Sequence, residues 1–326
     1  MAQTLARTTT SNVVNREDLG DLISNIAPSE TPLLSAAKTL TATNTYHEWL
    51  TDNLGTPANN AVAEGAVAGT PDDLHTQTRL GNFTQISRKV YGVSNTMESV
   101  DSAGFDSAIA YAAAKAAREL KTDVDFAICA GDQVGAHGSG TRTSASLNAW
   151  ITNASRDTTT GADPVGANGT AVDTQSSSTR PFSEGLLTDV IEQCWTDGGK
   201  PSLIVAGPKQ RGVFSQFDGL NTAAGTSGNS TARTDRASRT IMGTAEVYVS
   251  NYGQLSVVAS RHIRQKASVD TDVWLIDPEN IGVAFLRPWQ EQELAVTGDG
   301  RDRMMTVEWT LQMTTPNAHG QVADLN

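Results

Sequence analysis

The chain has 326 residues, a formal net charge of −12 and a sequence pI near 4.8. That length can bury a substantial core and suggests one or two domains, or one elongated domain with insertions. The acidic balance argues against a nucleic-acid binder, which needs a basic footprint to displace counterions from phosphates. No apolar run reaches the length of a membrane span, and the N-terminus lacks the apolar core of a signal peptide. We therefore expect a protein without a membrane partner, made and used inside a cell or in something assembled there.

The N-terminal region has the pattern of an arm rather than of a domain. Residues 1–14 are polar and rich in threonine, which predicts a flexible tail. Two short helical pieces follow, the first ended by Pro28 and the second opened by Pro32. Pieces this short bury little by themselves, so we expect the arm to lie on another surface, either of its own domain or of a neighbour.

The next region predicts an extended hairpin. Residues 43–51 and 83–93 are typical of strands. The connection between them is rich in Gly, Ala, Asn, Asp and Pro and has no convincing helical period. A compact domain rarely carries so long an irregular loop unless the loop has a function. We expect this loop to reach a partner.

Residues 101–131 form the one clear long helix. Alanine dominates its middle, and its apolar residues recur at steps of three and four, which predicts one buried face. That face consists of Phe105, Ile109, Ala113, Ala116, Leu120, Val124, Ala127 and Ile128. We expect Asp101 or Ser102 to cap the start and Gly131 to supply a left-handed residue after the end. Such a helix would be roughly 40 Å long and would act as a spine for the rest of the fold.

Residues 132–182 show the least pattern, because Gly, Ser, Thr, Asn and Asp crowd together. Their composition predicts a surface loop or a flexible insertion. Leu147, Trp150 and Ile151 suggest one small anchored element inside it.

Residues 183–260 predict a compact α/β subdomain in the order helix, strand, helix, hairpin. Ser183 is the expected cap of the first helix, and Gly198 its stop. Its expected inward face consists of Leu186, Leu187, Val190, Ile191, Cys194 and Trp195. A buried strand is expected at 201–206, a helix from Pro208, and hairpin strands at 244–250 and 255–260.

The C-terminal part predicts β-strands again. We expect strands at 273–276, at 281–286 with a stop at Arg287-Pro288, and at 293–296. Residues 305–313 alternate cleanly, which predicts a strand with one buried face. That face carries Met305, Val307, Trp309, Leu311 and Met313. The tail after it is polar.

The search for chemistry is mostly negative. The histidines do not share a metal-ligand spacing, and no strand is followed by a G-x-S-x-G elbow. The glycine-rich residues 135–141 lack the lysine of a phosphate loop. Cys129 and Cys194 are predicted to be reduced, buried thiols, with a disulfide or metal pair as the minor alternative. We predict no enzymatic activity, no metal and no cofactor, and a protein that binds or assembles.

The order of arm, hairpin, long helix, α/β subdomain and returning strands resembles the major capsid proteins of tailed bacteriophages with the Hong Kong 97 fold. Several stretches look similar to the SU-10 type of phage capsid family. These are Asn15–Pro28, Thr31–Leu34, Thr43–Trp49, Glu64–Gly65, Leu286–Trp289, Thr297–Asp299 and Glu308–Leu311. The resemblance spans most of the chain and is weakest over 132–182.

The resemblance implies an α+β phage capsid fold. Residues 1–41 would be the N-terminal arm, 42–96 the extended (E) loop, 97–182 the peripheral (P) domain with the spine helix and the insertion, 183–270 the axial (A) domain, and 271–326 the return to the P domain. Hexamers and pentamers would close into an icosahedral shell around double-stranded DNA, in a virion assembled in the host cytoplasm.

The partners that the resemblance implies are other copies of the same chain. Portal, scaffolding and decoration proteins are left open as further partners, and packaged DNA would lie nearby without sequence-specific binding. The candidate subunit-interface residues are Arg16, Leu19, Leu22, Ile23, Tyr46, Trp49, Phe83, Tyr91, Arg287 and Trp289. For the aromatic residues of the hairpin, packing of strand against strand within one subunit is the alternative.

Two other classes of protein compete with this interpretation. The Thr, Ser and Gly content and the many short strands would suit a binding module such as a phage decoration or adhesin domain. The long alanine-rich helix argues against it. An α/β hydrolase-like enzyme built on 183–260 is the second alternative, but no nucleophile or base supports it.

Overall fold

The computed structural model describes residues 30–52, 54–55, 57–67, 69, 77–100, 106–138, 140–156, 166–172, 179–215, 217, 247–266, 269–296 and 298–326. The predicted arm up to residue 29, with Arg16, Leu19, Leu22 and Ile23, lies outside the described residues, as does Phe105. No helix in the described ranges is long and apolar enough to cross a membrane.

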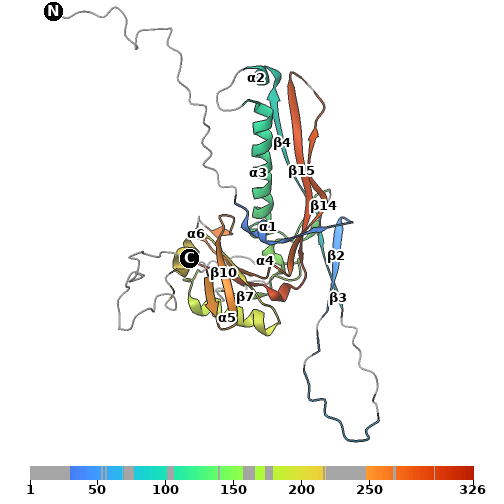
Figure 1. Cartoon of the computed structure of the whole chain (residues 1–326), viewed down its shortest axis with the longest axis vertical. Coiled ribbons are helices and arrows are strands. Elements are labelled where there is room, and N and C mark those ends of the chain that lie inside the picture. Colours follow the sequence, from blue (N-terminus) through green and yellow to red (C-terminus); the bar gives the residue numbers. More distant parts are fainter. Residues whose placement is uncertain are drawn as a thin grey trace, which may run out of the picture.

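The first of two main sheets has four strands in the order β1-β14-β15-β4. These strands are β1 (Lys38–Thr41), β14 (Ile281–Glu293), β15 (Gly300–Met313) and β4 (Gln85–Ser94). β1 runs parallel to β14, and the other neighbours are antiparallel. The β14–β15 hairpin is long, and it carries the sheet up beside the spine helix (Figure 1).

The spine helix α3 (Ala108–Cys129) packs along β4 and β15. Its 22 residues make it about 33 Å long. Leu120, Val124 and Ile128 are buried, as the period predicted, and Lys89 of β4 reaches Asp123 of the helix at 2.9 Å. The long amphipathic helix is therefore confirmed, and its buried face lies on the sheet.

The predicted ends of this helix are wrong. Its N-cap is Ser107, whose hydroxyl accepts a hydrogen bond from the Ala110 N–H. A second acceptor comes from Glu98 of α2 (Asn95–Ser99), which binds the Ser107 hydroxyl and the Ile109 N–H. At the other end Asp132, with φ 40°, takes the left-handed backbone predicted for Gly131. An aspartate tolerates that region because its short polar side chain bonds locally.

The second main sheet has six strands in the order β7-β16-β13-β8-β10-β9. They are β7 (Asn153–Ser155), β16 (Gly320–Val322), β13 (Val273–Ile276), β8 (Leu203–Ala206), β10 (Gly253–Ala259) and β9 (Val247–Ser250). The helices α5 (Glu184–Thr196) and α6 (Pro208–Phe214) pack beside it. The predicted order of helix, strand, helix and hairpin is confirmed.

Several details of this subdomain differ from the prediction. Trp195 is exposed rather than inward, with its ring 5.3 Å from that of Tyr252. β13 pairs with β8 and with β16 instead of joining β14 and β15. The tail is polar in composition but buried, since Val322 and Leu325 lie in the core beside α5. Within this tail, β16 pairs with β13 and β7, which places its backbone inside the sheet.

The shorter elements connect these bodies. They are α1 (Pro32–Ala36), β2 (Tyr46–Thr51), β3 (Thr78–Phe83), β5 (Ala136–His137), β6 (Arg142–Thr143), α4 (Leu147–Trp150), β11 (Gln265–Lys266), β12 (Val269–Asp270) and η2 (Pro316–Ala318). The anchored element around Leu147 is confirmed as α4, but the surface loop predicted around it is wrong for most of 140–156. Leu147, Trp150 and Ile151 are fully buried in the core that also contains α3.

The predicted stop at Arg287-Pro288 is also wrong. β14 continues to Glu293, and its pairing with β15 shifts register between Phe285 and Arg287 and again between Arg287 and Gln290. Proline cannot donate to a ladder, but a bulge removes the need for that donor. The strand predicted at 305–313 is confirmed, but the prediction of one buried face is wrong, because Thr306, Glu308 and Thr310 on the opposite face are buried as well.

The alanine face of the spine helix gives a stability test. Ala116 is buried against the sheet, whereas Ala114, on the same helix, is exposed. We expect Ala116→Leu to destabilise the fold by about 1–3 kcal/mol, because a tightly packed site cannot take three more carbons without strain. Ala114→Leu adds the same atoms in solvent and should change stability by less than about 0.5 kcal/mol. Chemical denaturation followed by circular dichroism measures both, and equal losses would contradict the assigned face.

Candidate functional site

The described part of the connection between β2 and β3 stands away from the body of the protein (Figure 1). The two strands pair antiparallel from Tyr46 opposite Phe83 to Thr51 opposite Thr78. We call residues 52–77 the extended loop. In its described part, residues 57–67 are all exposed, and Leu54 is 100% exposed. A loop that holds apolar side chains in water offers them to another surface.

The predicted second hairpin strand, 83–93, is wrong in extent and in partner. The chain forms two strands there, β3 and β4, which are separated at Thr84. β3 belongs to the ladder of the extended loop, whereas β4 pairs with β15 in the four-stranded sheet. Thr84 is thus the point where the chain passes from the loop ladder to the sheet.

Contacts of Trp49 and Asn82 attach the β2–β3 ladder to the body of the protein. Trp49 of β2 is only 8% exposed, and its ring lies 5.3 Å from that of Trp150 in α4. Asn82 of β3 is buried, donates to the Leu311 carbonyl at 2.8 Å and accepts from the Ala145 N–H at 2.9 Å. These contacts join the ladder to both the sheet and the α4 region, so the extended loop projects from a rigid mount.

A buried carboxylate holds the break between β3 and β4 at Thr84. The Glu308 side chain is 4% exposed and pairs with Arg142 and with Arg287, the latter at 2.7 Å. It also accepts from the Thr84 hydroxyl at 2.9 Å. Burial opposes ionisation of Glu308, but hydrogen bonds from Arg287 and Thr84 and the two guanidinium charges outweigh it and lower its pKa. The carboxylate therefore stays ionised and binds three segments together.

A second buried carboxylate joins the two halves of the protein. Asp125 of α3 accepts from the Leu34 N–H at 2.9 Å and lies 3.0 Å from Nδ1 of His262, which follows β10. Nearby, Arg264 pairs with Asp272 at 2.6 Å and with Asp132 at 3.2 Å. The spine helix, α1 of the arm and the six-stranded sheet thus meet at one polar joint.

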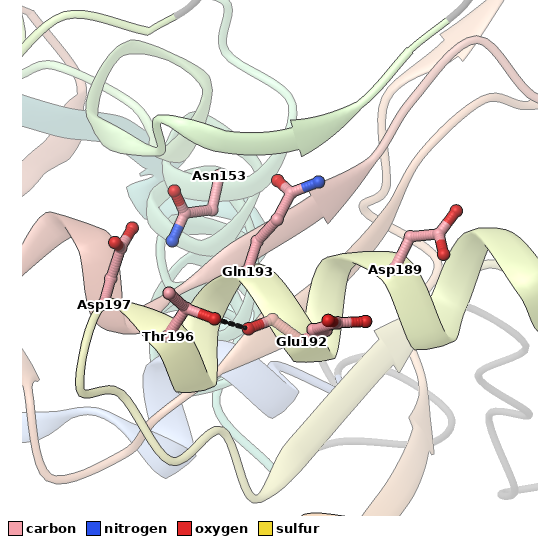
Figure 2. A pocket seen from close by; sticks show the side chains of 6 residues that line it. All are labelled: Asn153, Asp189, Glu192, Gln193, Thr196 and Asp197. Carbon is pink, nitrogen blue, oxygen red and sulfur yellow. Dashed lines mark hydrogen bonds between the residues drawn. The ribbon is translucent and has the colours of Figure 1, made fainter.

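The open groove along α5 does not have the character of a catalytic pocket. It measures about 430 Å³ and is lined by Asn153, Asp189, Glu192, Gln193, Thr196 and Asp197 (Figure 2). Its lining contains carboxylates, amides and one hydroxyl, but no histidine, lysine or cysteine. Among the residues that the structure describes, no group of His, Cys, Asp and Glu could hold a metal ion. Cys129 and Cys194 are confirmed as buried free thiols, and burial raises the pKa of Cys194 to about 12.

The predicted interface residues within the described ranges lie in two places. Tyr46, Trp49 and Phe83 stand at the base of the ladder, with the Tyr46 and Phe83 rings 4.6 Å apart. Tyr91, Arg287 and Trp289 belong to the four-stranded sheet. Tyr91 donates to Glu291, and Trp289 lies 6.2 Å from Phe285. The interface role of all six stays a prediction.

Asn82 and Glu308, which hold the loop ladder, do not stand out in the sequence. Each is one of several polar residues in its strand, and such a position is predicted to face solvent. The signal that could have found Glu308 is the pair of arginines that meet it, but Arg142 and Arg287 lie far from it in sequence.

Several solved structures with a similar fold are capsids. The capsid of cyanophage A-1(L) superposes with a TM-score of 0.68, at 11% identity over 98% of this chain and 99% of that chain. The capsid of a native GTA particle gives a TM-score of 0.63, at 14% identity over all of both chains. The fold is therefore that of the phage major capsid proteins, an α+β fold of the Hong Kong 97 type.

The sequence places the chain within this class. The family model of the SU10 major capsid protein matches residues 5–326, so the chain belongs to that family. The major capsid protein of Escherichia phage Phieco32 is 30% identical over 136 residues. That match spans 41% of this chain and 36% of the relative.

The buried pair at Glu308 predicts a pH-dependent stability. We expect Glu308→Gln to cost about 1.5–3 kcal/mol at neutral pH, because two guanidinium partners lose their charged acceptor. A lowered carboxyl pKa contributes stability above the unfolded value near 4.5, and that contribution is lost as the pH falls through the folded value. The difference in free energy of unfolding between wild type and variant should therefore shrink as the solution is acidified from neutral pH to below the pKa of Glu308 in the folded protein.

Glu291→Gln is the matched control, because Glu291 pairs with Arg303 at a half-exposed site. Its loss should stay below about 1 kcal/mol. Urea titrations over a series of pH values measure both variants. A Glu308→Gln loss that is small or independent of pH would contradict the assigned role.

Proposed function

We propose that this chain is the main structural subunit of a tailed-phage head, which self-assembles through hexamers and pentamers into an icosahedral shell around double-stranded DNA. Membership of a major capsid protein family and the fold support the proposal. The observation that carries it is the extended loop, which holds apolar side chains in solvent on a rigid mount. The subunit would act in the virion after assembly in the host cytoplasm, without enzymatic activity or a cofactor.

We propose a domain division that follows the sheets. The arm would extend to residue 41 and the E-loop from 42 to 84, because β4 pairs within the four-stranded sheet. The P domain would combine α3 with that sheet. The A domain would take the six-stranded sheet, including β13 and the buried C-terminal tail.

The extended loop supplies a useful share of the contact energy. Leu54, Val62 and Val67 of the loop, together with Leu50 at the end of β2, are between 65% and 100% exposed in the isolated chain. Burying them on a neighbour would contribute about 1.5–3 kcal/mol each. Association itself costs on the order of 4–15 kcal/mol, so one loop roughly offsets that cost and other contacts must complete the interface. We propose that the arm and residues such as Tyr46 and Trp289 belong to those contacts.

The assembly state tests this function directly. We expect the purified chain to form rings, sheets or shells that size-exclusion chromatography and negative-stain microscopy reveal. A contact between two different patches of the same chain generates closed rings or extended arrays. A chain that stays monomeric at high concentration, with or without phage scaffolding factors, would contradict the proposal.

The extended loop can be removed without touching its mount. Replacing residues 53–76 by Asn-Gly joins Asp52 to Gln77 just beyond the last ladder pair, Thr51 with Thr78. We expect this variant to keep wild-type stability within about 1 kcal/mol, because none of the described residues it loses belongs to the core. Its assembly should fall sharply. Normal assembly of the variant would show that the loop does not reach a neighbour.

We expect an acidic shell not to bind tightly to the DNA that it encloses. The net charge of −12 would repel phosphates, so packaged DNA could slide during filling and exit. We expect electrophoretic mobility shifts to show no tight binding of double-stranded DNA by the purified chain at low salt. A tight affinity that falls steeply with salt would mean that phosphate contacts dominate, and would contradict this expectation.

A further inference from the structure

The exposed side of the spine helix carries a basic face in an otherwise acidic protein. Lys115, Arg118 and Lys121 are all exposed and follow the i, i+3, i+6 spacing of one side of a helix. On the side of α3 that faces the sheet, the carboxylates of Glu119 and Asp123 form ion pairs with Lys89. The Lys115 ammonium lies 3.9 Å from the Glu119 carboxylate, so the ion pair between them is weak. Within the described residues, no ion pair reaches Arg118 or Lys121, so this basic face presents unneutralised charge.

An acidic face of similar length lies on α5. Asp189 and Glu192 of α5, and Asp197 directly after its end, line the open groove of about 430 Å³ (Figure 2). In the described part of the chain, none of these three carboxylates is part of an ion pair. The hydroxyl of Thr196 in the same groove is already occupied, because it donates to the Glu192 carbonyl at 2.8 Å.

The placement of these carboxylates is unfavourable in the isolated subunit. Glu192 and Asp197 lie at the C-terminal end of α5, where the helix dipole is negative, and the last turn contains no basic residue. Such an arrangement costs roughly 0.3–1 kcal/mol for each charge. Cations brought by another molecule would relieve that cost.

The two faces carry charges of opposite sign, hold three charged residues each and have similar lengths. The basic face runs from Lys115 to Lys121, about 9 Å along a helix axis, and the acidic face from Asp189 to Asp197, about 12 Å. They lie on different subdomains of one chain, α3 beside the four-stranded sheet and α5 beside the six-stranded sheet (Figure 1). A contact between them in two copies would therefore be heterologous, the type that closes rings.

We propose that the basic face of α3 in one copy docks on the acidic face of α5 in the next copy. This inference rests on the proposed function, because it assigns one of the contacts that join neighbouring subunits. Exposed ion pairs contribute only about 0.2–1 kcal/mol each. The contact therefore sets the register of neighbouring copies and speeds their encounter, while apolar surfaces such as the extended loop supply most of the affinity.

Charge reversal tests the pairing. The first variant combines Arg118→Glu with Lys121→Glu, and the second combines Asp189→Lys with Glu192→Lys. All four side chains are exposed, so both variants should fold, which circular dichroism and thermal unfolding verify. We expect each variant to assemble on the order of tenfold more slowly than wild type at low salt, by light scattering. A variant that carries all four substitutions should recover most of the wild-type rate.

Mixing the two folded variants gives a sharper version of the test. In a heterologous contact, each variant repels itself but attracts the other through both of its faces. An equimolar mixture should therefore assemble faster than either variant does alone, with subunits in alternation. The control for the first variant combines Lys200→Glu with Lys209→Glu, which changes the net charge as that variant does, at exposed positions outside both faces, and should assemble like wild type.

Two results would overturn the inference while leaving the proposed function intact. One is a reversed variant that assembles like wild type at low salt. The other is a fourfold variant, or a mixture, that is as impaired as the single-face variants, since the faces would then meet different partners, with DNA as one of them. If the wild-type chain itself forms no rings, sheets or shells, the proposed function fails, and this inference fails with it.

Discussion

The carboxylate of Asp125 is the constraint on which the arrangement of the two halves depends. It is completely buried in the spine helix, where an unpaired charge would be prohibitively unfavourable. Its oxygens are bound by the Leu34 N–H and lie beside His262, so three segments far apart in sequence must meet at this point. Arg264 extends the same joint to Asp132 and Asp272. Because a partly satisfied polar network is costlier than an apolar core, such a joint favours one relative position of the two sheets.

The extended loop depends on that rigidity. A loop binds a neighbour well only if little conformational freedom is lost when it docks, and preorganisation reduces that cost. Trp49 against Trp150, Asn82 against Leu311 and the Glu308 cluster fix the base of the ladder to the body. The tip can then be irregular and rich in small residues, since its position is determined by its mount.

Much of the fold could be predicted because its elements follow regular periods. The 3.6-residue period predicted α3 and α5, and the alternation at 305–313 predicted β15, an inner strand of the four-stranded sheet. The errors arose where tertiary contacts override local signals. Pro288 is a strong stop in sequence, yet a bulge lets β14 pass through it. Thr84 carries no turn signal, yet Glu308 holds the break between two strands there. Trp150 lies in a stretch whose composition is that of a loop, yet it is a central core residue. The candidate interface was harder still, because the faces of different copies meet only in an assembly.

Apolar burial and charge act differently in such an assembly. Apolar contacts are not directional, so a loop with leucine and valine at its surface can adhere in several registers. Charges contribute little affinity at an exposed site but penalise every wrong juxtaposition of like sign. A subunit with net charge −12 repels its copies over distances of about 10 Å at moderate ionic strength. Under the proposed docking, the basic face of α3 is one of the surfaces where approach is favoured, and it would orient the incoming copy before apolar surfaces meet. The acidic balance therefore does more than maintain solubility: it makes the few basic surfaces of the subunit the directions from which a neighbour can approach.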